Sequence, residues 1–343
     1  MPEITFFIGN GFDLNMGLET RYDQFCNYYI QQNPKDFLAQ SMKKDTELWS
    51  DVEIALGKIT EQVPNGEEDH FGESKDLLEI SLGDYLENEQ RKIRISNEQQ
   101  EQIAKDMKRY LTSFYQELPF EHMQNIEGVI KRCRGTLKYS FVSFNYTNVL
   151  DRCIEITKRQ LNSDLGAYSS DNGNKYPQNL GNVIHIHGTI ESEMILGVND
   201  IDQIADRRFT ENSLYRQCMI KEETNKRFAQ NKIQRVKKLI DESCIICIFG
   251  MSIGETDKMW WQYIGKWLLA SSEHRLVIYI RHNSQRKRVT ARERFITENI
   301  VLQRFKENSG IKEEWEKAES KIYIVCNGNI FNFSIIHIQK SIE

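Results

Sequence analysis

Short apolar runs alternate along the chain with long stretches of helical periodicity. The first run, EITFFI at residues 3–8, ends at a glycine and is typical of a buried central strand. Later runs share this apolar, β-branched character: LKYSFVSFN at 137–145, NVIHIHG at 182–188, EMILGV at 193–198, CIICIFG at 244–250, RLVIYI at 275–280 and KIYIVC at 321–326. Since strands that alternate with helices usually pair in parallel, we predict an α/β fold with a mainly parallel sheet and helices on both faces.

Strand signals nearly vanish between residues 20 and 132. Segments such as YDQFCNYYIQQ, ELWSDVEIALGKITEQV and EQIAKDMKRYLTSFYQEL place apolar residues at helical spacing, opposite charged faces. We therefore predict a large helical insertion or cap, residues 23–132, after the first strand. The sheet domain then consists of residues 1–22 and 133–343.

Composition adds limits to this picture. The chain has 343 residues, of which 28% are charged and 39% hydrophobic, as in soluble globular proteins. No apolar run approaches the roughly 20 residues of a membrane span, and no signal peptide precedes the first strand. We expect a cytoplasmic protein without a membrane association, with its seven cysteines reduced. Cys244 and Cys247 have C-x-x-C spacing, but they lie in an apolar run without a second pair, so no metal site is predicted.

Charge is distributed unevenly. The net charge of −5 argues against nucleic-acid binding by the protein as a whole. Locally, RHNSQRKRVTARER at 281–294 is strongly basic. This segment is either a solvated helix face or a surface that contacts phosphate or a partner.

Small or polar residues follow several of the predicted strands. These are Gly9–Asp13, Ser143–Thr147, His185–Gly188 and Gly250–Ser252. Ligands of open parallel sheets bind outside the carboxyl ends of the strands, so we expect the four segments to converge on one ligand site.

The glycine-rich turn after the first strand suggests a phosphate site, although Leu14 stands where a dinucleotide fingerprint has its third glycine. Backbone N–H groups of Gly9, Asn10 and Gly11 would carry the phosphate. Asp13 either caps a helix or accepts a hydrogen bond from a ribose hydroxyl.

The other strand ends offer amide, imidazole and carboxylate groups. Asn145 is either a turn former or a residue that holds a ribose hydroxyl or a water, and Thr147 or Asn148 could cap the next helix. His185 and His187 share one face if their strand is regular, and His187 is the better candidate because it ends the strand. Asp257 either contacts ribose or caps a helix.

The leading I-G-N-G-F-D-L, followed by G-L-x-T-x-Y, resembles the AbiH family, bacterial proteins associated with abortive infection against bacteriophage. The resemblance continues at LWSDVEIALG (48–57), SFNYTNVLD (143–151), HIHGTI (185–190), ILGVND (195–200) and FGMSIGETDKMWW (249–261). It implies an antiphage function and a possible phage-derived trigger.

The same sites more distantly resemble the sirtuin nucleotide-binding fold. Gly9, Gly11 and Gly17 fall on the sirtuin glycines, and Asn145 falls on the asparagine of T-x-N-x-D. The catalytic H-G is similar to His187–Gly188, and the later G-T-S to Gly250–Ser252. This resemblance implies a Rossmann-like, doubly wound sheet and, as ligand, NAD or another adenine nucleotide.

Departures from the sirtuin pattern restrict the implied chemistry. Asp13 replaces a serine, and Glu19–Tyr22 replaces P-D-F-R. The zinc module is missing, since only Cys218 lies between Gly188 and Cys244. Protein deacetylation is therefore disfavoured, which leaves hydrolysis of NAD or another N-glycosidic or phosphoester cleavage.

These observations lead to one hypothesis, cleavage of the nicotinamide–ribose bond of NAD, with Asn145 and His187 as catalytic residues and no metal or other cofactor. The predicted nucleotide-binding residues are Gly9, Asn10, Gly11, Phe12, Asp13, Gly17, Thr20, Thr147, Gly188, Gly250, Ser252 and Asp257. The alternatives are a non-catalytic nucleotide sensor and a nuclease or nucleic-acid-binding effector that uses the basic segment. The sequence leaves open whether the protein forms a homo-oligomer.

Overall fold

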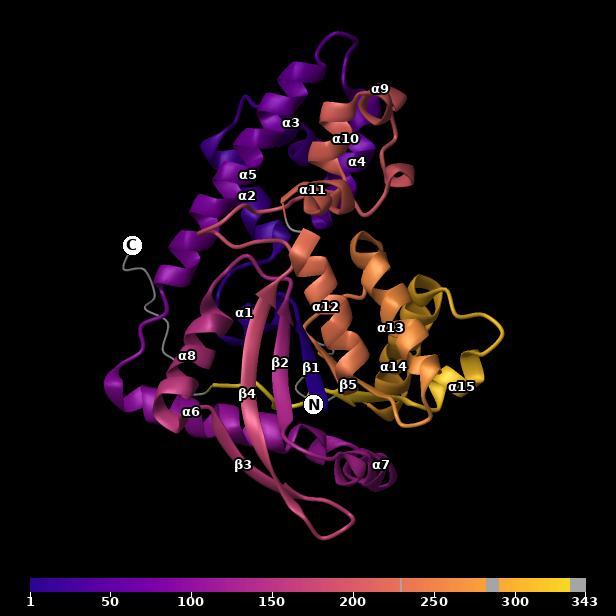
Figure 1. Ribbon diagram of the computed structural model, residues 1–343. Coiled ribbons are helices and arrows are strands. Elements are labelled where there is room, and N and C mark those ends of the chain that lie inside the picture. The colour runs from indigo at the N-terminus through magenta and orange to yellow at the C-terminus, as the bar shows by residue number, and fades with distance from the viewer. Residues whose placement is uncertain (229, 282–289, 334–343) are drawn as a thin grey trace.

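Seven strands form one sheet in the order β3-β4-β2-β1-β5-β6-β7 (Figure 1). The computed structural model describes residues 1–228, 230–281 and 290–333. The strands are β1 (Glu3–Ile8), β2 (Leu137–Ser143), β3 (Asp164–Ser169), β4 (Lys175–His185), β5 (Ser243–Phe249), β6 (Arg275–Ile280) and β7 (Ile322–Cys326). Every pairing is parallel except that of β3 with β4, so the predicted mainly parallel α/β sheet is confirmed.

The central strand β1 lies between β2 and β5, and all six of its residues are buried. Phe6 and Ile8 pack into the apolar cluster on one face of the sheet, and Phe7 packs into the cluster on the other. This alternation explains why the sequence run is continuously apolar: a strand covered on both faces has no polar side.

Helices cover both faces (Figure 1). One cluster includes side chains of α6 (Asn97–Thr112), α7 (Phe120–Arg132) and α8 (Val149–Leu161). The other includes α12 (Gln230–Glu242), α13 (Lys258–Ala270), α14 (Ala291–Ser309) and α15 (Trp315–Glu319). The sheet is thus buried between two helical layers.

A third apolar cluster lies in a separate group of helices beyond the carboxyl ends of the strands (Figure 1). This helical lobe combines α2 (Tyr22–Gln32), α3 (Phe37–Lys44), α4 (Val52–Ile59) and α5 (Glu68–Arg91) with residues 190–228. The second segment contains α9 (Arg207–Glu211), α10 (Ser213–Met219) and α11 (Lys221–Phe228). Short elements complete the described chain: α1 (Gly11–Asn15), η1 (Leu48–Ser50), η2 (Thr60–Gln62), η3 (Phe114–Glu117), η4 (Ile201–Gln203) and η5 (Glu255–Asp257).

The lobe and the predicted insertion 23–132 overlap without coinciding. Within that range, α6 and α7 pack against the sheet, whereas the lobe recruits residues 190–228 from further along the chain. The division of the chain into two domains at these boundaries therefore stays a prediction.

One predicted strand is wrong. Residues 193–198 form no strand; Val198 makes a single bridge to Ile220, and Ile195, Leu196 and Val198 are buried. Apolar residues in a short run indicate burial but do not identify what the run packs against.

In the described part of the chain, no helix combines the length and the apolar character needed to cross a bilayer.

The lobe depends on one close contact, which yields a stability prediction. A Cβ atom on Gly57 in α4 would lie 2.2 Å from the carbonyl oxygen of Gln203. Helix propensity alone favours Gly57→Ala by up to about 1 kcal/mol. We expect the opposite sign, a loss of about 1–3 kcal/mol in the free energy of unfolding measured by urea denaturation, because the two segments are forced apart.

The matched control is Gly83→Ala in the middle of α5, where the nearest atoms to an added Cβ are those of the flexible Met194 side chain at 3.9 Å. This variant is expected to be neutral or more stable by up to about 1 kcal/mol. Equal stabilisation by both substitutions would contradict the packing of Gln203 on α4.

Candidate active site

A pocket of about 890 Å³ lies where the strands end beneath the helical lobe. Residues that follow six strands line it, among them Gly9, Phe144, His187, Gly250, Arg281 and Asn327. The lobe contributes Tyr22, Asp51, Glu53 and Lys221. A cavity of this size at the carboxyl ends of parallel strands is typical of small-molecule sites in α/β proteins.

The glycine-rich turn forms part of the pocket, and it is packed against the loop after β5. Gly9 N–H donates to Phe249 O and Gly11 N–H donates to Gly250 O, both at 2.9 Å. A Cβ atom on Gly11 would lie 2.4 Å from Gly250 Cα. Close backbone contact therefore accounts for these glycines, and their N–H groups already have partners.

Asn10 and Thr20 close the same turn. Thr20 Oγ1 donates to Asn10 Oδ1 at 2.5 Å, and Asn10 Nδ2 donates to Thr20 O at 2.8 Å. Gly17 has φ +85°, which lets the chain reverse between α1 and Thr20. Of the three, Asn10 lines the pocket.

Several predicted site residues are buried and do not line the pocket, among them Phe12, Asp13, Asn145 and Thr147. Thr147 Oγ1 donates to Asp13 Oδ2 at 2.6 Å, and Asp13 is only 2% exposed. Burial raises the pKa of Asp13 to about 7, although Thr147 and the Asn145 amide oppose the shift. Asp13 Oδ1 and Asn145 Nδ2 have no hydrogen-bond partner in the described structure. Phe12, also buried, stacks edge-on against Phe331 in the core.

The two histidines occupy different environments. The regular strand ends at His185, whose Nδ1 lies 2.9 Å from Asn145 O and whose Nε2 lies 2.7 Å from Asp151 Oδ2 on α8. Both ring nitrogens are used, so His185 has a structural role. His187, past the strand, lines the pocket, and Gly188 forms the turn after it with φ +78°.

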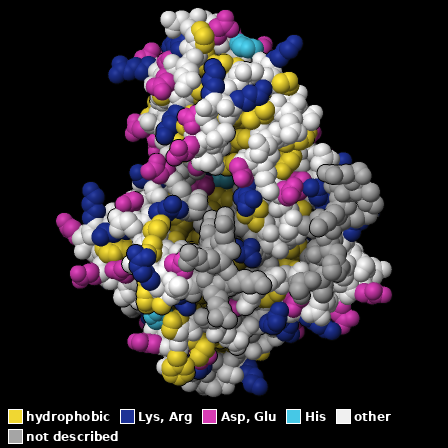
Figure 2. Space-filling view, turned by 180° about the vertical axis from the view of Figure 1, so that it is seen from behind, with side chains coloured by type: hydrophobic (Ala, Val, Ile, Leu, Met, Phe, Trp, Pro, Cys, Tyr) yellow, Lys and Arg dark blue, Asp and Glu magenta, His cyan; other side chains and the backbone are white. Residues whose placement is uncertain are grey.

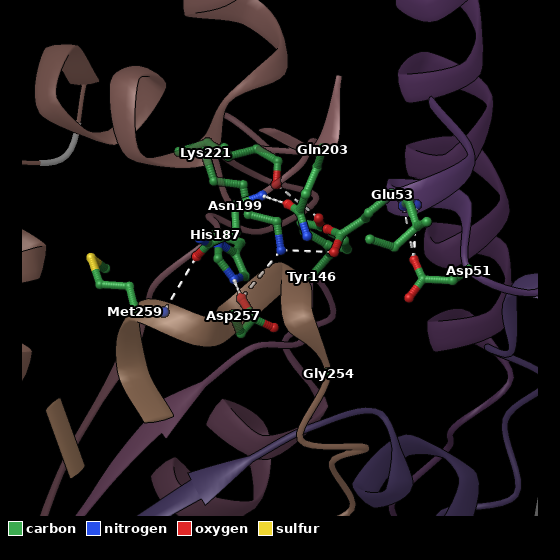
Figure 3. Close-up of polar contacts among 12 residues, drawn as sticks. Asp51, Glu53, Tyr146, His187, Asn199, Gln203, Lys221, Gly254, Asp257 and Met259 are labelled. Atoms are coloured by element: carbon green, nitrogen blue, oxygen red, sulfur yellow. Dashed lines mark hydrogen bonds and ion pairs between the residues drawn. The ribbon is translucent and has the colours of Figure 1, made fainter. Parts of the chain in front are cut away.

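His187 is held by a buried chain of charges that the sequence did not reveal (Figure 3). Its Nε2 lies 2.9 Å from Asp257 Oδ1, and the same oxygen lies 3.2 Å from Lys221 Nζ. Lys221 Nζ also donates to Glu53 Oε2 at 2.7 Å. Asp257 stands at the N-cap of α13, but its side chain forms no cap. Instead, its carboxylate accepts hydrogen bonds from the His187 imidazole and the Lys221 ammonium.

Electrostatics determine the protonation of this chain. Burial lowers the pKa of His187, and the Lys221 ammonium lowers it further. Burial opposes the charge of Asp257, but Lys221 and His187 outweigh it and hold the carboxyl pKa below its ordinary value. Asp257 and Glu53 raise the pKa of Lys221 despite its burial. Burial raises the pKa of Glu53 to about 7.

A neutral imidazole beside an anionic Asp257 carries its proton on Nε2. Its lone pair is then on Nδ1, which is buried and has no hydrogen-bond partner among the described residues. His187 Nδ1 is therefore an acceptor that no described residue uses, on a residue that lines the pocket.

Two arginines and a serine lie among the largely apolar remainder of the pocket lining. Arg281 follows β6 and donates to Asn15 Oδ1 at 2.9 Å, and Arg304 lies on α14. Ser252 is exposed in the loop after β5. Most of the basic segment 281–294 lies outside the described residues; of its described part, Arg281 faces the pocket and Arg294 pairs with Glu298.

Glu53 and Lys221 were missed because they are 168 residues apart and neither belongs to a strand end. For Glu53 the available signal was its place in the LWSDVEIALG stretch; for Lys221 there was none. In the described portion of the chain, no three His, Cys, Asp or Glu side chains are arranged to hold a metal ion.

Comparison with known protein families gives a match over most of the chain. The family model of the bacteriophage abortive infection protein AbiH matches residues 5–279. This range includes the whole His187 charge chain. No curated protein matches the chain.

The buried Asp13 yields a pH prediction. Its folded pKa of about 7 exceeds the roughly 3.9 of an unfolded Asp, so its contribution to stability is present below pH 4 and is lost as the pH rises through 7. Relative to Asp13→Asn, the wild type should lose up to about 4 kcal/mol of unfolding free energy over this range. Urea denaturation from pH 4 to 8 measures the difference.

Thr147→Val serves as the companion variant. It removes the hydroxyl that donates to Asp13, so the loss of stability should continue to higher pH. A difference between wild type and Asp13→Asn that is constant with pH would show that Asp13 ionises as freely in the folded protein as in the unfolded chain.

Proposed function

As the chain belongs to the AbiH family and is a bacterial antiphage abortive-infection protein, we propose that it acts by hydrolysing the nicotinamide–ribose bond of NAD. The observation that carries this proposal is the His187–Asp257 pair in the pocket wall, with His187 Nδ1 buried and unpartnered among the described residues. A base held in one tautomer beside a nucleotide-sized cavity is what the reaction requires.

The strand order supports a dinucleotide ligand. Without β3, the order β4-β2-β1-β5-β6-β7 corresponds to the 3-2-1-4-5-6 order of a doubly wound, Rossmann-like sheet. In such sheets the ligand lies at the point where the strand order reverses, here beside β1. The pocket includes Gly9 and Gly250, which follow β1 and β5 at that point.

The charges of the pocket also fit a dinucleotide. Arg281 and Arg304 offer guanidinium groups, which favour a pyrophosphate. Asp257 and Glu53 offer carboxylates, which favour the cationic ribose of an oxocarbenium-like transition state.

In the proposed reaction the C1′–N bond breaks, and its electron pair remains on the pyridine nitrogen of the departing neutral nicotinamide. A water molecule bonds to C1′ and loses a proton to His187 Nδ1, either directly or through a ribose hydroxyl. The products are ADP-ribose, nicotinamide and one proton, which His187 releases to solvent. Asp257 stabilises the imidazolium that forms.

Asn145 has a less direct place in this scheme. Its side chain is buried and does not line the pocket, and its backbone carbonyl lies against His185. A role in positioning water remains a prediction. So do the cytoplasmic location, the phage-derived trigger and a homo-oligomer.

The test is release of nicotinamide from NAD by the purified protein, with and without lysate of phage-infected cells as a source of the trigger. His187→Asn should reduce the rate by about 100-fold or more, and Asp257→Asn similarly, because one removes the base and the other its orienting anion. His70→Asn, an exposed histidine on α5, is the control and should retain full activity.

Parallel incubations with ATP and with plasmid DNA test the alternatives. Nucleotide binding without product in either condition would favour a sensor. Plasmid cleavage with intact NAD would contradict the proposal in favour of a nuclease. On the face shown in Figure 2, the Lys and Arg side chains of the described residues are interspersed with Asp and Glu and form no continuous basic surface.

A further inference from the structure

A buried lysine joins the helical lobe to the sheet at the pocket. Lys221 is 4% exposed, and its ammonium lies between Glu53 of α4 and Asp257 of η5 (Figure 3). Taking an ammonium out of water costs several kcal/mol, so such a group persists only where carboxylates compensate it closely. All three of these residues line the pocket.

The chain of contacts crosses from one part of the fold to the other. Glu53 and Lys221 belong to the two segments of the lobe, whereas Asp257 and His187 follow strands of the sheet. A second link lies nearby: Met259 N–H donates to Asn199 Oδ1 at 3.3 Å (Figure 3). His187 therefore depends, through Asp257, on residues that only the lobe supplies.

We propose that Glu53 and Lys221 are positioning residues: they hold Asp257 in place and thereby fix His187 with its proton on Nε2 and its lone pair on Nδ1. The helical lobe thus completes the site instead of merely covering it. The catalytic consequence rests on the proposed function, but the state of His187 is measurable without any reaction.

The charged groups around His187 determine whether a substitution raises or lowers the pKa of its imidazole. Asp257 contacts the ring directly, Lys221 of α11 lies behind that carboxylate, and Lys232 of α12 adds a weaker positive field. Phe144 packs edge-on against the His187 ring, with 5.3 Å between the ring centroids, and Trp261 stacks on Phe144. Removing the Lys221 charge should favour the imidazolium, and removing the Glu53 charge should not.

The experiment is an NMR titration of protein with isotope-labelled histidine, in which the His187 signal is assigned by His187→Gln. In the wild type, His187 should be neutral at pH 7 with the proton on Nε2. Lys221→Met should raise its pKa by about one unit or more, because a nearby cation has been removed. Lys221→Arg should restore the pKa toward the wild-type value.

Glu53→Gln supplies the second variant, which keeps the shape of the side chain. It should lower the His187 pKa, opposite in sign to Lys221→Met, or free the ring proton to move to Nδ1, because Lys221 loses one of the two carboxylates that hold it beside Asp257. Lys75→Met is the matched control: Lys75 is another buried lysine of the lobe, paired with Glu79 outside the pocket lining. It should leave the His187 titration unchanged.

Two outcomes would overturn the proposal. One is a folded Lys221→Met protein in which His187 titrates as in the wild type. The other, decisive even if Lys221→Met fails to fold, is a folded Glu53→Gln protein in which both the pKa of His187 and its Nε2 tautomer stay as in the wild type.

The pH dependence of nicotinamide release tests whether Glu53 and Lys221 affect activity. The acidic limb, where His187 becomes protonated, should move upward in pH for Lys221→Met by the shift seen in the titration. If no variant and no wild type releases nicotinamide, the proposed function fails, while the titration still decides whether the lobe controls His187.

Discussion

The Lys221 ammonium is buried between the carboxylates of Glu53 and Asp257. This ion chain links the helical lobe to the sheet at the pocket, and the geometry of the site depends on it. The desolvation of the ammonium is compensated only when both carboxylates are in place, and they come from different parts of the fold. Hydrophobic packing and hydrogen bonds such as that of Ile190 N–H to Tyr146 O also join the lobe to the sheet. The buried ion chain adds a strict constraint on their placement, because a small displacement leaves a charge unpaired in the interior.

Most strands of the sheet could be predicted from the sequence, and the reason is physical. Parallel strands covered on both faces are predominantly apolar, and β1, β5, β6 and β7 show that pattern clearly, whereas β2 also contains a lysine and two serines. The edge strand β3 alternates exposed and buried residues and contains a glycine, so it gave no such signal. Residues 193–198 gave a false one, since their apolar side chains fill the lobe.

The sequence could predict which residues lie at the ends of strands, but it could not predict the direction in which their side chains point. The strand ends do line one pocket, at Gly9, Phe144, His187 and Gly250. Yet Asp13 and Thr147, equally near those ends, turn toward each other behind the pocket. Which way a side chain turns depends on packing between distant segments, and the contact of Glu53 with Lys221 is of the same kind. No local pattern encodes it.

The walls of the pocket are drawn from nearly the whole described chain, from Gly9 to Asn332. Synthesis on the ribosome proceeds from the N-terminus, so the asparagines after β7 emerge after all the other lining residues. A fragment that ends before Asn332 lacks part of the cavity wall. The order of translation therefore delays completion of the pocket until the residues after β7 have been made.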